Sequence, residues 1–141
     1  MKLEYHIKGG DFNSVGSASS EVKKILKQLN IDPHSIKRIV VSLYEAEVNI
    51  AAHAYYGTIK VAIKPEKVKV RLEDHGPGIP DINLAMQEGY STASQAVREM
   101  GFGAGMGLPN IKKNTDAFLL ESEVGKGTTL TFENYIKRDK S

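Results

Sequence analysis

Two polar residues of one predicted helix have the types and the spacing for metal binding and proton transfer. Glu45 and Asn49 are four residues apart, so their side chains lie on the same face of a helix. The amide oxygen of Asn49 is a suitable ligand for Mg²⁺, which keeps several waters and takes few protein ligands. The carboxylate of Glu45 can orient or deprotonate a nucleophile. The alternative at this point is a solvated helix face, because short motifs often match by accident.

A second candidate residue lies where a predicted strand ends. The apolar face of this strand consists of Val68, Val70 and Leu72. Asp74 continues the same face, because side chains alternate along a strand. A carboxylate there is costly to bury unless a donor binds it, and the exocyclic amine of adenine is such a donor. Gly76 and Gly78 follow, and they allow either a close approach of the backbone to a ligand or a tight turn.

Glycines alternate along a third segment, which precedes a short predicted helix. They are Gly101, Gly103, Gly105 and Gly107. Such a segment presents free backbone N–H groups, and the start of a helix adds partial positive charge, so phosphate binding is predicted. The lysine of a P-loop is absent, and no strand precedes the glycines as in a Rossmann motif. The alternative is a flexible loop.

A threonine near the end of the chain shares a strand face with core residues. Leu130 and Phe132 are predicted to face the core, and Thr128 has the same parity. Its hydroxyl would lie beside the end of the Asp74 strand, where it could bind a base directly or through water.

The hydrophobic pattern predicts the elements that position these residues. Alternation predicts strands at 3–7, 59–63, 68–72, 118–121 and 128–132. Helical periodicity predicts a first helix capped by Ser17, Ser19 or Ser20, a long helix at about 34–55 that Gly57 ends, and a short helix at about 108–114. This order predicts an α+β two-layer sandwich, with helices on one face of a mixed, mainly antiparallel sheet.

Length and composition favour a single domain over residues 1–141, with a lid at about 81–107. The net charge of +2 is too small to indicate nucleic acid or an anionic membrane. The chain has no cysteine, which excludes disulfides and thiolate metal sites. No run approaches the roughly 20 apolar residues of a membrane span, and no signal peptide is visible, so we expect a cytoplasmic protein.

Four short motifs follow one another in this chain. They are Glu45-Ala-Glu-Val-Asn49, Asp74-His-Gly76-Pro-Gly78, Gly103-Ala-Gly105-Met-Gly107 and Gly125-Lys-Gly-Thr128. As an ordered set they resemble the N, G1 and G2 boxes and the final adenine-side threonine of the Bergerat-fold (GHKL) ATPase superfamily, which includes gyrase, Hsp90, histidine kinases and MutL. The resemblance covers residues from about 10 to 133 and implies the Bergerat ATP-binding fold.

The short length and three further phrases resemble a narrower group, the bacterial anti-sigma-factor serine/threonine kinases and the stressosome switch kinases. The phrases are Glu88-Gly-Tyr-Ser-Thr92, Gly105-Met-Gly-Leu-Pro109 and Glu121-Ser-Glu-Val-Gly-Lys-Gly-Thr-Thr129. The resemblance implies ATP and Mg²⁺ as cofactors and a serine or threonine of a regulatory protein as phosphate acceptor. That partner is a sigma factor, an antagonist or a phosphatase-like protein, with no role for nucleic acid or membrane. Relatives often form dimers, so a homodimer stays open.

The resemblance also implies a role for each matching residue. Glu45 would be the catalytic base, and Asn49 would bind Mg²⁺ beside the nucleotide. Asp74 would bind the adenine amine, and Thr128 would complete the adenine pocket. The residues that wrap the nucleotide would be Gly76, Gly78, Gly103, Gly105 and Gly107. Lys112 or Lys113 could reach phosphate.

One residue departs from the family pattern. Glu47 falls within about 20° of the apolar stripe of its helix, where the family has a small or apolar residue. Either the helix is rotated, or Glu47 has a buried partner, or it faces a polar surface, since an unpaired buried carboxylate is too costly.

Two functions other than a kinase remain open from the sequence. The first is a nucleotide-dependent binding module that changes its affinity for a partner with little or no catalysis. The second is a stand-alone ATP hydrolase, in which water replaces the hydroxyl of the partner.

Overall fold

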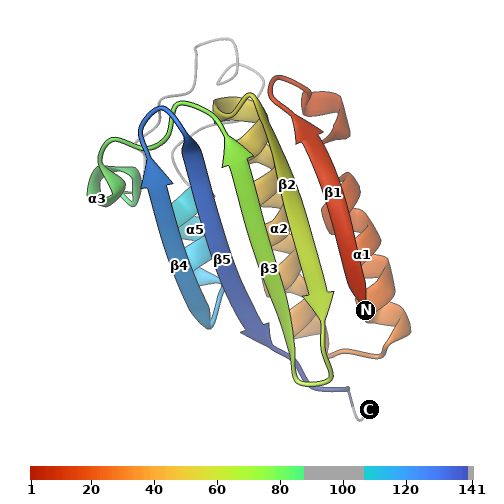
Figure 1. Ribbon diagram of the computed structural model, residues 1–141. Helices are drawn as coiled ribbons and strands as arrows, with labels where there is room; N and C mark the ends of the chain where they lie inside the picture. Colours follow the sequence, from red (N-terminus) through yellow and green to blue (C-terminus); the bar gives the residue numbers. More distant parts are fainter. Residues whose placement is uncertain (88–106, 140–141) are drawn as a thin grey trace.

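Strands and helices form two layers in the computed structural model, which describes residues 1–87 and 107–139 (Figure 1). The strands are β1 (Lys2–Lys8), β2 (Tyr56–Ile63), β3 (Lys67–His75), β4 (Ala117–Glu123) and β5 (Gly127–Tyr135). The helices are α1 (Ser17–Gln28), α2 (Pro33–His53), α3 (Ile82–Ala85) and α5 (Gly107–Lys113), with a 3₁₀ turn, η1 (Phe12–Ser14). The α+β prediction is confirmed.

The strands lie in the order β1-β2-β3-β5-β4, and each of these neighbouring pairs is antiparallel. The predicted sheet was mixed, whereas the described one is antiparallel throughout. The central strand, β3, pairs with β5, which comes from a distant part of the chain. This pairing places the end of β3 beside the start of β5, so Asp74 and Thr128 are brought together.

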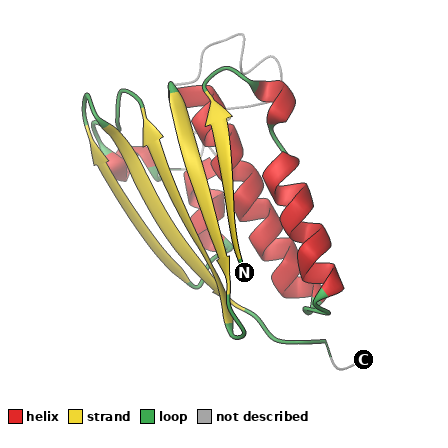
Figure 2. Cartoon of the chain, turned by 45° about the vertical axis from the view of Figure 1, so that its right-hand side comes forward, coloured by secondary structure: helices red, strands yellow, loops and turns green. Residues whose placement is uncertain are grey.

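The helices α1, α2 and α5 cover one face of the sheet, and the other face is open to solvent (Figure 2). Strand alternation explains this arrangement, because every second residue is buried in β2, in β5 and in β3 as far as Leu72. The largest fully buried side chains are Phe132, Leu26, Ile39, Leu43, Ile50, Ile59, Leu72, Ile111 and Leu130. No helix in the described part of the chain is long and apolar enough to cross a membrane.

The long helix α2 starts and stops for clear local reasons. Asp32 caps it by accepting the Ser35 N–H at 3.0 Å, and Pro33 occupies the first turn. Its last residue is His53, two residues before the predicted end at 55. The chain leaves the helix early because the Tyr55 N–H donates to the His75 carbonyl at 2.8 Å, which begins the pairing with β3.

Gly57, predicted to end this helix, lies instead inside β2. A Cβ at this position would come within 2.9 Å of Ile50 Cδ1. The glycine therefore lets the strand pack directly against α2. Gly57 therefore serves close packing, and the prediction that it ends the helix was wrong.

The start of α1 differs from the prediction of a serine cap. The N-cap residue is Gly16, with φ of 100°, and no side chain of its own caps the helix. The carboxylate of Glu47 in α2 takes that role, accepting the Ala18 N–H at 2.9 Å and the Ser19 N–H at 3.3 Å. Glu47 is 1% exposed, so of the three alternatives for this residue the buried partner is the correct one.

Candidate functional site

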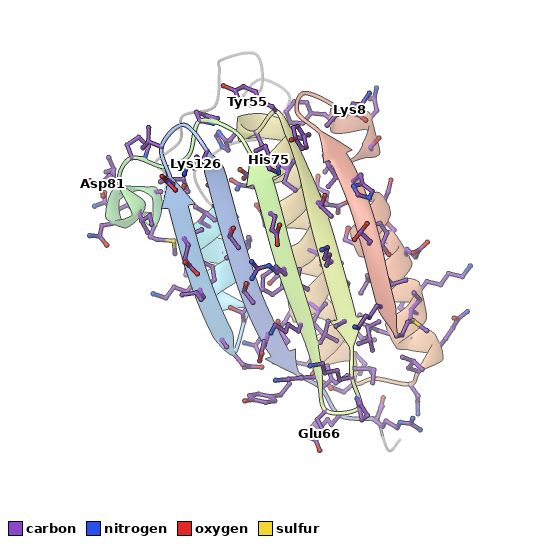
Figure 3. The ribbon with its side chains drawn as sticks, in the orientation of Figure 1. Lys8, Tyr55, Glu66, His75, Asp81 and Lys126 are labelled. Atoms are coloured by element: carbon purple, nitrogen blue, oxygen red, sulfur yellow. The ribbon has the colours of Figure 1, made fainter. Side chains whose placement is uncertain are left out.

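Three segments that carry candidate residues meet at one end of the sheet. His75 at the end of β3 and Lys126 in the β4–β5 turn lie at this end, and Glu66 at the tip of the β2–β3 hairpin lies at the opposite end (Figure 3). The C-terminal end of α2 also reaches this end of the sheet, since Tyr55 pairs with His75 directly after it. Three of the four predicted motifs, those in α2, at the end of β3 and before Thr128, therefore lie toward the same end of the sheet.

Asp74 and Thr128 contact each other directly. The Thr128 N–H donates to Asp74 Oδ1 at 2.9 Å, and the Thr128 side chain is buried, as predicted. Among the described residues, no hydrogen bond reaches the second carboxylate oxygen of Asp74. Burial raises the pKa of Asp74 above its ordinary value, while the Thr128 N–H and the charge of His75 oppose this rise. Asp74 thus keeps an acceptor oxygen in a half-buried place.

Gly127 permits this contact. Its φ is +141°, and a Cβ at this position would lie 2.1 Å from the Asp74 carbonyl oxygen and 3.1 Å from Asp74 Oδ1. Any larger residue would push the start of β5 away from Asp74. The glycine before Thr128 is therefore a steric requirement of the Asp74–Thr128 pair.

Ser122 connects these residues to the loop that follows β3, and the sequence analysis missed it. Its Oγ donates to the Gly127 carbonyl at 3.0 Å and accepts the Ile79 N–H at 2.7 Å. It also lies 2.8 Å from the Thr128 hydroxyl, which is the donor in this bond because the single proton of Ser122 is already used. Ser122 lies directly opposite Thr128 in the pairing of β4 with β5, and this position could have identified it once the register was known.

The two glycines after Asp74 pack closely against their surroundings. A Cβ at Gly76 would lie 3.0 Å from Ala54 Cα, at the end of α2. Gly78 has φ of +79°, and a Cβ there would lie 2.4 Å from the Glu123 carbonyl oxygen. The Gly125 N–H also donates to the Pro77 carbonyl at 2.9 Å, which ties this loop to the β4–β5 turn. Both glycines are thus required by tight contact.

The carboxylate of Glu45 lies between α2 and α5. A Cβ at Gly107 would come within 3.3 Å of Glu45 Oε2. Burial raises the pKa of Glu45, and the side chain of Asn110 in α5 opposes the rise. Asn49 lies one turn further along α2 and is partly exposed. The structure therefore brings Glu45 to Gly107, the one glycine of the predicted phosphate segment that is described.

Gly103 and Gly105 lie outside the described residues, as does most of the predicted lid at about 81–107, so these assignments stay predictions. Lys112 and Lys113 are both exposed, in the last turn of α5. Burial lowers the pKa of His53, near the end of α2. Among residues 1–87 and 107–139, no three His, Cys, Asp or Glu side chains form a group that could hold a metal ion.

Comparison with known proteins decides the family. The sequence profile of the histidine kinase-like ATPase domain matches residues 11–133. The chain belongs to this family. It is 36% identical over 119 residues to the serine/threonine-protein kinase RsbT of Bacillus subtilis (strain 168), which covers 82% of this chain and 84% of RsbT. It is 33% identical over 128 residues to the anti-sigma F factor of Thermoanaerobacter sp. (strain X514), covering 87% of this chain and 86% of that protein.

The fold of this histidine kinase-like ATPase domain also matches a solved structure. The RsbU and RsbW domains of Rv1364c from Mycobacterium tuberculosis align with a TM-score of 0.65 and 16% identity, over 98% of this chain and 32% of that one. At 16% identity this match shows a similar fold and nothing about function. The relatives confirm the predicted superfamily and the class of ATP-dependent serine/threonine kinases of the anti-sigma-factor type.

The described residues fit the ATP that this family uses. Asp74 offers an acceptor oxygen at a half-buried position, and the Thr128 N–H holds its other oxygen in place. Gly76 and Gly78 let the loop after Asp74 pack closely against Ala54 and Glu123. An adenine ring with its amine toward Asp74 would therefore meet a matching acceptor oxygen beside a closely packed loop.

Proposed function

We propose that this chain binds ATP·Mg²⁺ and transfers the γ-phosphoryl group to a serine or threonine of a regulatory partner protein, with Glu45 as the base. The observation that carries the proposal is the position of Glu45. Its carboxylate is half-buried, has a raised pKa and borders the glycine segment at Gly107. A base with a raised pKa is better suited to accept a proton near neutral pH.

Asp74 would bind the adenine amine through its free oxygen, and Thr128 and Ser122 would hold that carboxylate and the loop after β3 in place. The glycines at 76 and 78 would let the backbone contact the nucleotide. Gly103, Gly105 and Gly107 would supply N–H groups to the phosphates. These residues would all act by holding the nucleotide in a fixed position, and such positioning is itself a source of catalysis.

Asn49 would bind the Mg²⁺ ion together with the phosphates and waters. The absence of a cluster of three acidic or imidazole side chains in the described part of the chain agrees with an ion held mainly by phosphate and water. When bound, ATP·Mg²⁺ supplies the phosphoryl group that the partner's hydroxyl oxygen accepts as ADP leaves. Glu45 takes the proton of that hydroxyl, so the attacking oxygen is not left protonated.

The partner would be a sigma factor, an antagonist or a phosphatase-like protein, and a homodimer of this chain stays open. The names of the relatives support a regulatory protein as partner, since one is an anti-sigma F factor. We also propose that residues 1–141 act as one cytoplasmic domain.

Phosphate transfer onto purified proteins encoded beside this chain's gene tests the proposal. The chain is incubated with ATP and Mg²⁺, and the phosphorylated residue is located by mass spectrometry. Glu45→Gln is expected to lower the transfer rate by about 10² to 10⁴, the range for a general base. Glu66→Gln, at the far end of the sheet, is the matched control and should leave the rate unchanged.

Retained transfer in Glu45→Gln would show that another group acts as the base. ATP binding without transfer to any partner would instead assign the chain to the nucleotide-dependent binding modules.

A further inference from the structure

The segment between β1 and α1, residues 9–19, is bonded at both of its ends to the C-terminal half of α2, and we call it the strap. At its start, the Gly9 N–H donates to the Tyr55 carbonyl at 2.8 Å. The Gly10 N–H donates to the Ala51 carbonyl, also at 2.8 Å. The last four carbonyls of a helix lack partners inside it, and Ala51 is 4% exposed, so its carbonyl has little access to water. The strap therefore caps the end of α2.

The other end of the strap is capped by α2 in return. The Ala18 and Ser19 N–H groups donate to the two carboxylate oxygens of Glu47. Glu47 and Ala18 are each 1% exposed, so these bonds are shielded from water. Helix α2 thus supplies acceptors to the start of α1, and the strap supplies a donor to the end of α2. Because a buried polar group without a partner is costly, the strap and α2 hold each other in one position.

Asn49, the proposed Mg²⁺ ligand, lies between the two attachment points on α2. It is two residues after Glu47 and two residues before Ala51. Two residues along an α-helix turn the side chain by about 200°, so Asn49 lies on the opposite side of α2 from Glu47. Glu45, four residues earlier, shares the side of Asn49. Any rotation of α2 about its axis would therefore move Glu45 and Asn49 together.

Gly9 allows the strap to lie against the end of α2. A Cβ at this position would overlap the Ala54 carbonyl oxygen and would lie 3.0 Å from the Tyr55 carbonyl oxygen. The next residue, Gly10, has φ of +82°, but a Cβ there would meet nothing within 4 Å. A side chain at residue 9 would therefore push the strap away from α2, whereas residue 10 has space for one.

We propose that the strap is a positioning element for Asn49: it fixes the rotation of the C-terminal half of α2, so that the Asn49 side chain is directed to the Mg²⁺ of the bound nucleotide. This inference rests on the proposed function. The strap would act through α2, without touching the nucleotide or the metal. Contacts that orient a metal ligand in this way matter, because their loss typically lowers metal affinity by about 10- to 100-fold.

The test measures how much Mg²⁺ increases the affinity for ATP, by isothermal titration calorimetry with ATP in Mg²⁺ and with ATP in EDTA. Gly9→Ala is expected to lower this increase by about tenfold, with the affinity in EDTA unchanged. Gly10→Asn is the matched control, because asparagine tolerates a positive φ and there is space for its Cβ. The control should keep the full effect of Mg²⁺.

A double variant tests whether the strap acts through Asn49. Gly9→Ala combined with Asn49→Ala should lose no more of the Mg²⁺ effect than Asn49→Ala alone, since two changes that act through one residue are not additive. Additive losses would contradict the proposal. Glu47→Gln tests the other attachment and should lower the Mg²⁺ effect in the same direction, and it decides the question if Gly9→Ala does not fold.

A full Mg²⁺ effect in folded Gly9→Ala and Glu47→Gln would overturn the proposal, and so would equal losses in Mg²⁺ and in EDTA, which indicate general damage to the pocket. Hydrogen exchange gives a readout without nucleotide. The Ala54 amide, which closes the last turn of α2 on Ile50, should exchange faster in Gly9→Ala than in Gly10→Asn. If Mg²⁺ leaves the affinity of the wild type unchanged, the assignment of Asn49 fails, and the exchange rates still decide whether the strap holds the end of α2.

Discussion

Glu47 Oε1 accepts the Ala18 N–H at 2.9 Å, so a residue in the middle of α2 holds the first turn of α1. The start of a helix has N–H groups without partners inside the helix, and here Gly16 has no side chain to satisfy them. Glu47 is two residues from both Glu45 and Asn49, and its carboxylate contacts α1, whereas the carboxylate of Glu45 lies close to α5 at Gly107. Helix α2 is thereby in contact with α1 on one side and with α5 on the other.

Replacing Glu47 should destabilise the fold. Glu47→Val leaves two buried N–H groups without acceptors, and we expect a loss of about 1–3 kcal/mol in the free energy of unfolding, measured by urea titration. Glu47→Gln keeps one acceptor oxygen and should lose less. Hydrogen exchange at Ala18 and Ser19 should quicken in the valine variant. A valine variant as stable as the wild type would show that burial of an apolar side chain offsets the lost bonds.

Asp74 should make stability depend on pH. Burial raises its pKa in the folded protein above the ordinary value of 3.8. A carboxyl with a raised pKa contributes its full stability below the unfolded pKa, and this contribution is lost as the pH rises through the folded pKa. Asp74→Asn stays neutral, so the stability of the variant relative to the wild type should increase with pH across this window. Urea unfolding at several pH values measures the difference, and a constant difference would contradict the raised pKa.

Gly127 and Gly125 provide a matched pair of positions for testing the proposed adenine contact at Asp74. Both have positive φ, but a Cβ at Gly127 would lie 2.1 Å from the Asp74 carbonyl oxygen, whereas a Cβ at Gly125 would meet nothing within 4 Å. Gly127→Ala should therefore weaken ATP binding by about tenfold or more, as one lost charge-assisted hydrogen bond would. Gly125→Ala carries only the backbone strain and should weaken binding far less. Isothermal titration calorimetry distinguishes the two, and equal losses would refute a steric role.

Ser122 should support the loop after β3. Ser122→Ala removes the acceptor of the Ile79 N–H and the partner of the Thr128 hydroxyl. We expect a loss of about 1–2 kcal/mol in unfolding free energy and faster hydrogen exchange at Ile79. Glu121→Ala, the exposed neighbour in β4, is the control. If Ile79 exchanges equally fast in both variants, the loop is held by its other contacts.

The sequence predicted the elements better than the contacts between them. The alternation of residues 68–72 and 128–132 gave β3 and β5, and parity placed Asp74 and Thr128 on the inner face, because these signals are local and periodic. The partner of Glu47 could not be predicted, since the helix-packing geometry that brings Ala18 to it is tertiary. Ser122 could not be predicted for the same reason, because it connects β4, β5 and the loop after β3.

The pairing of β3 with β5 has a consequence for synthesis of the chain. Asp74 and the Thr128 N–H that fixes it are 54 residues apart, and β5 comes last among the strands. Contacts between such distant segments form late in folding, because a long loop must close first. A chain emerging from the ribosome therefore cannot complete the Asp74–Thr128 contact until β5 is released. If Asp74 binds adenine as proposed, nucleotide binding reports on a finished domain, since no earlier fragment holds both residues.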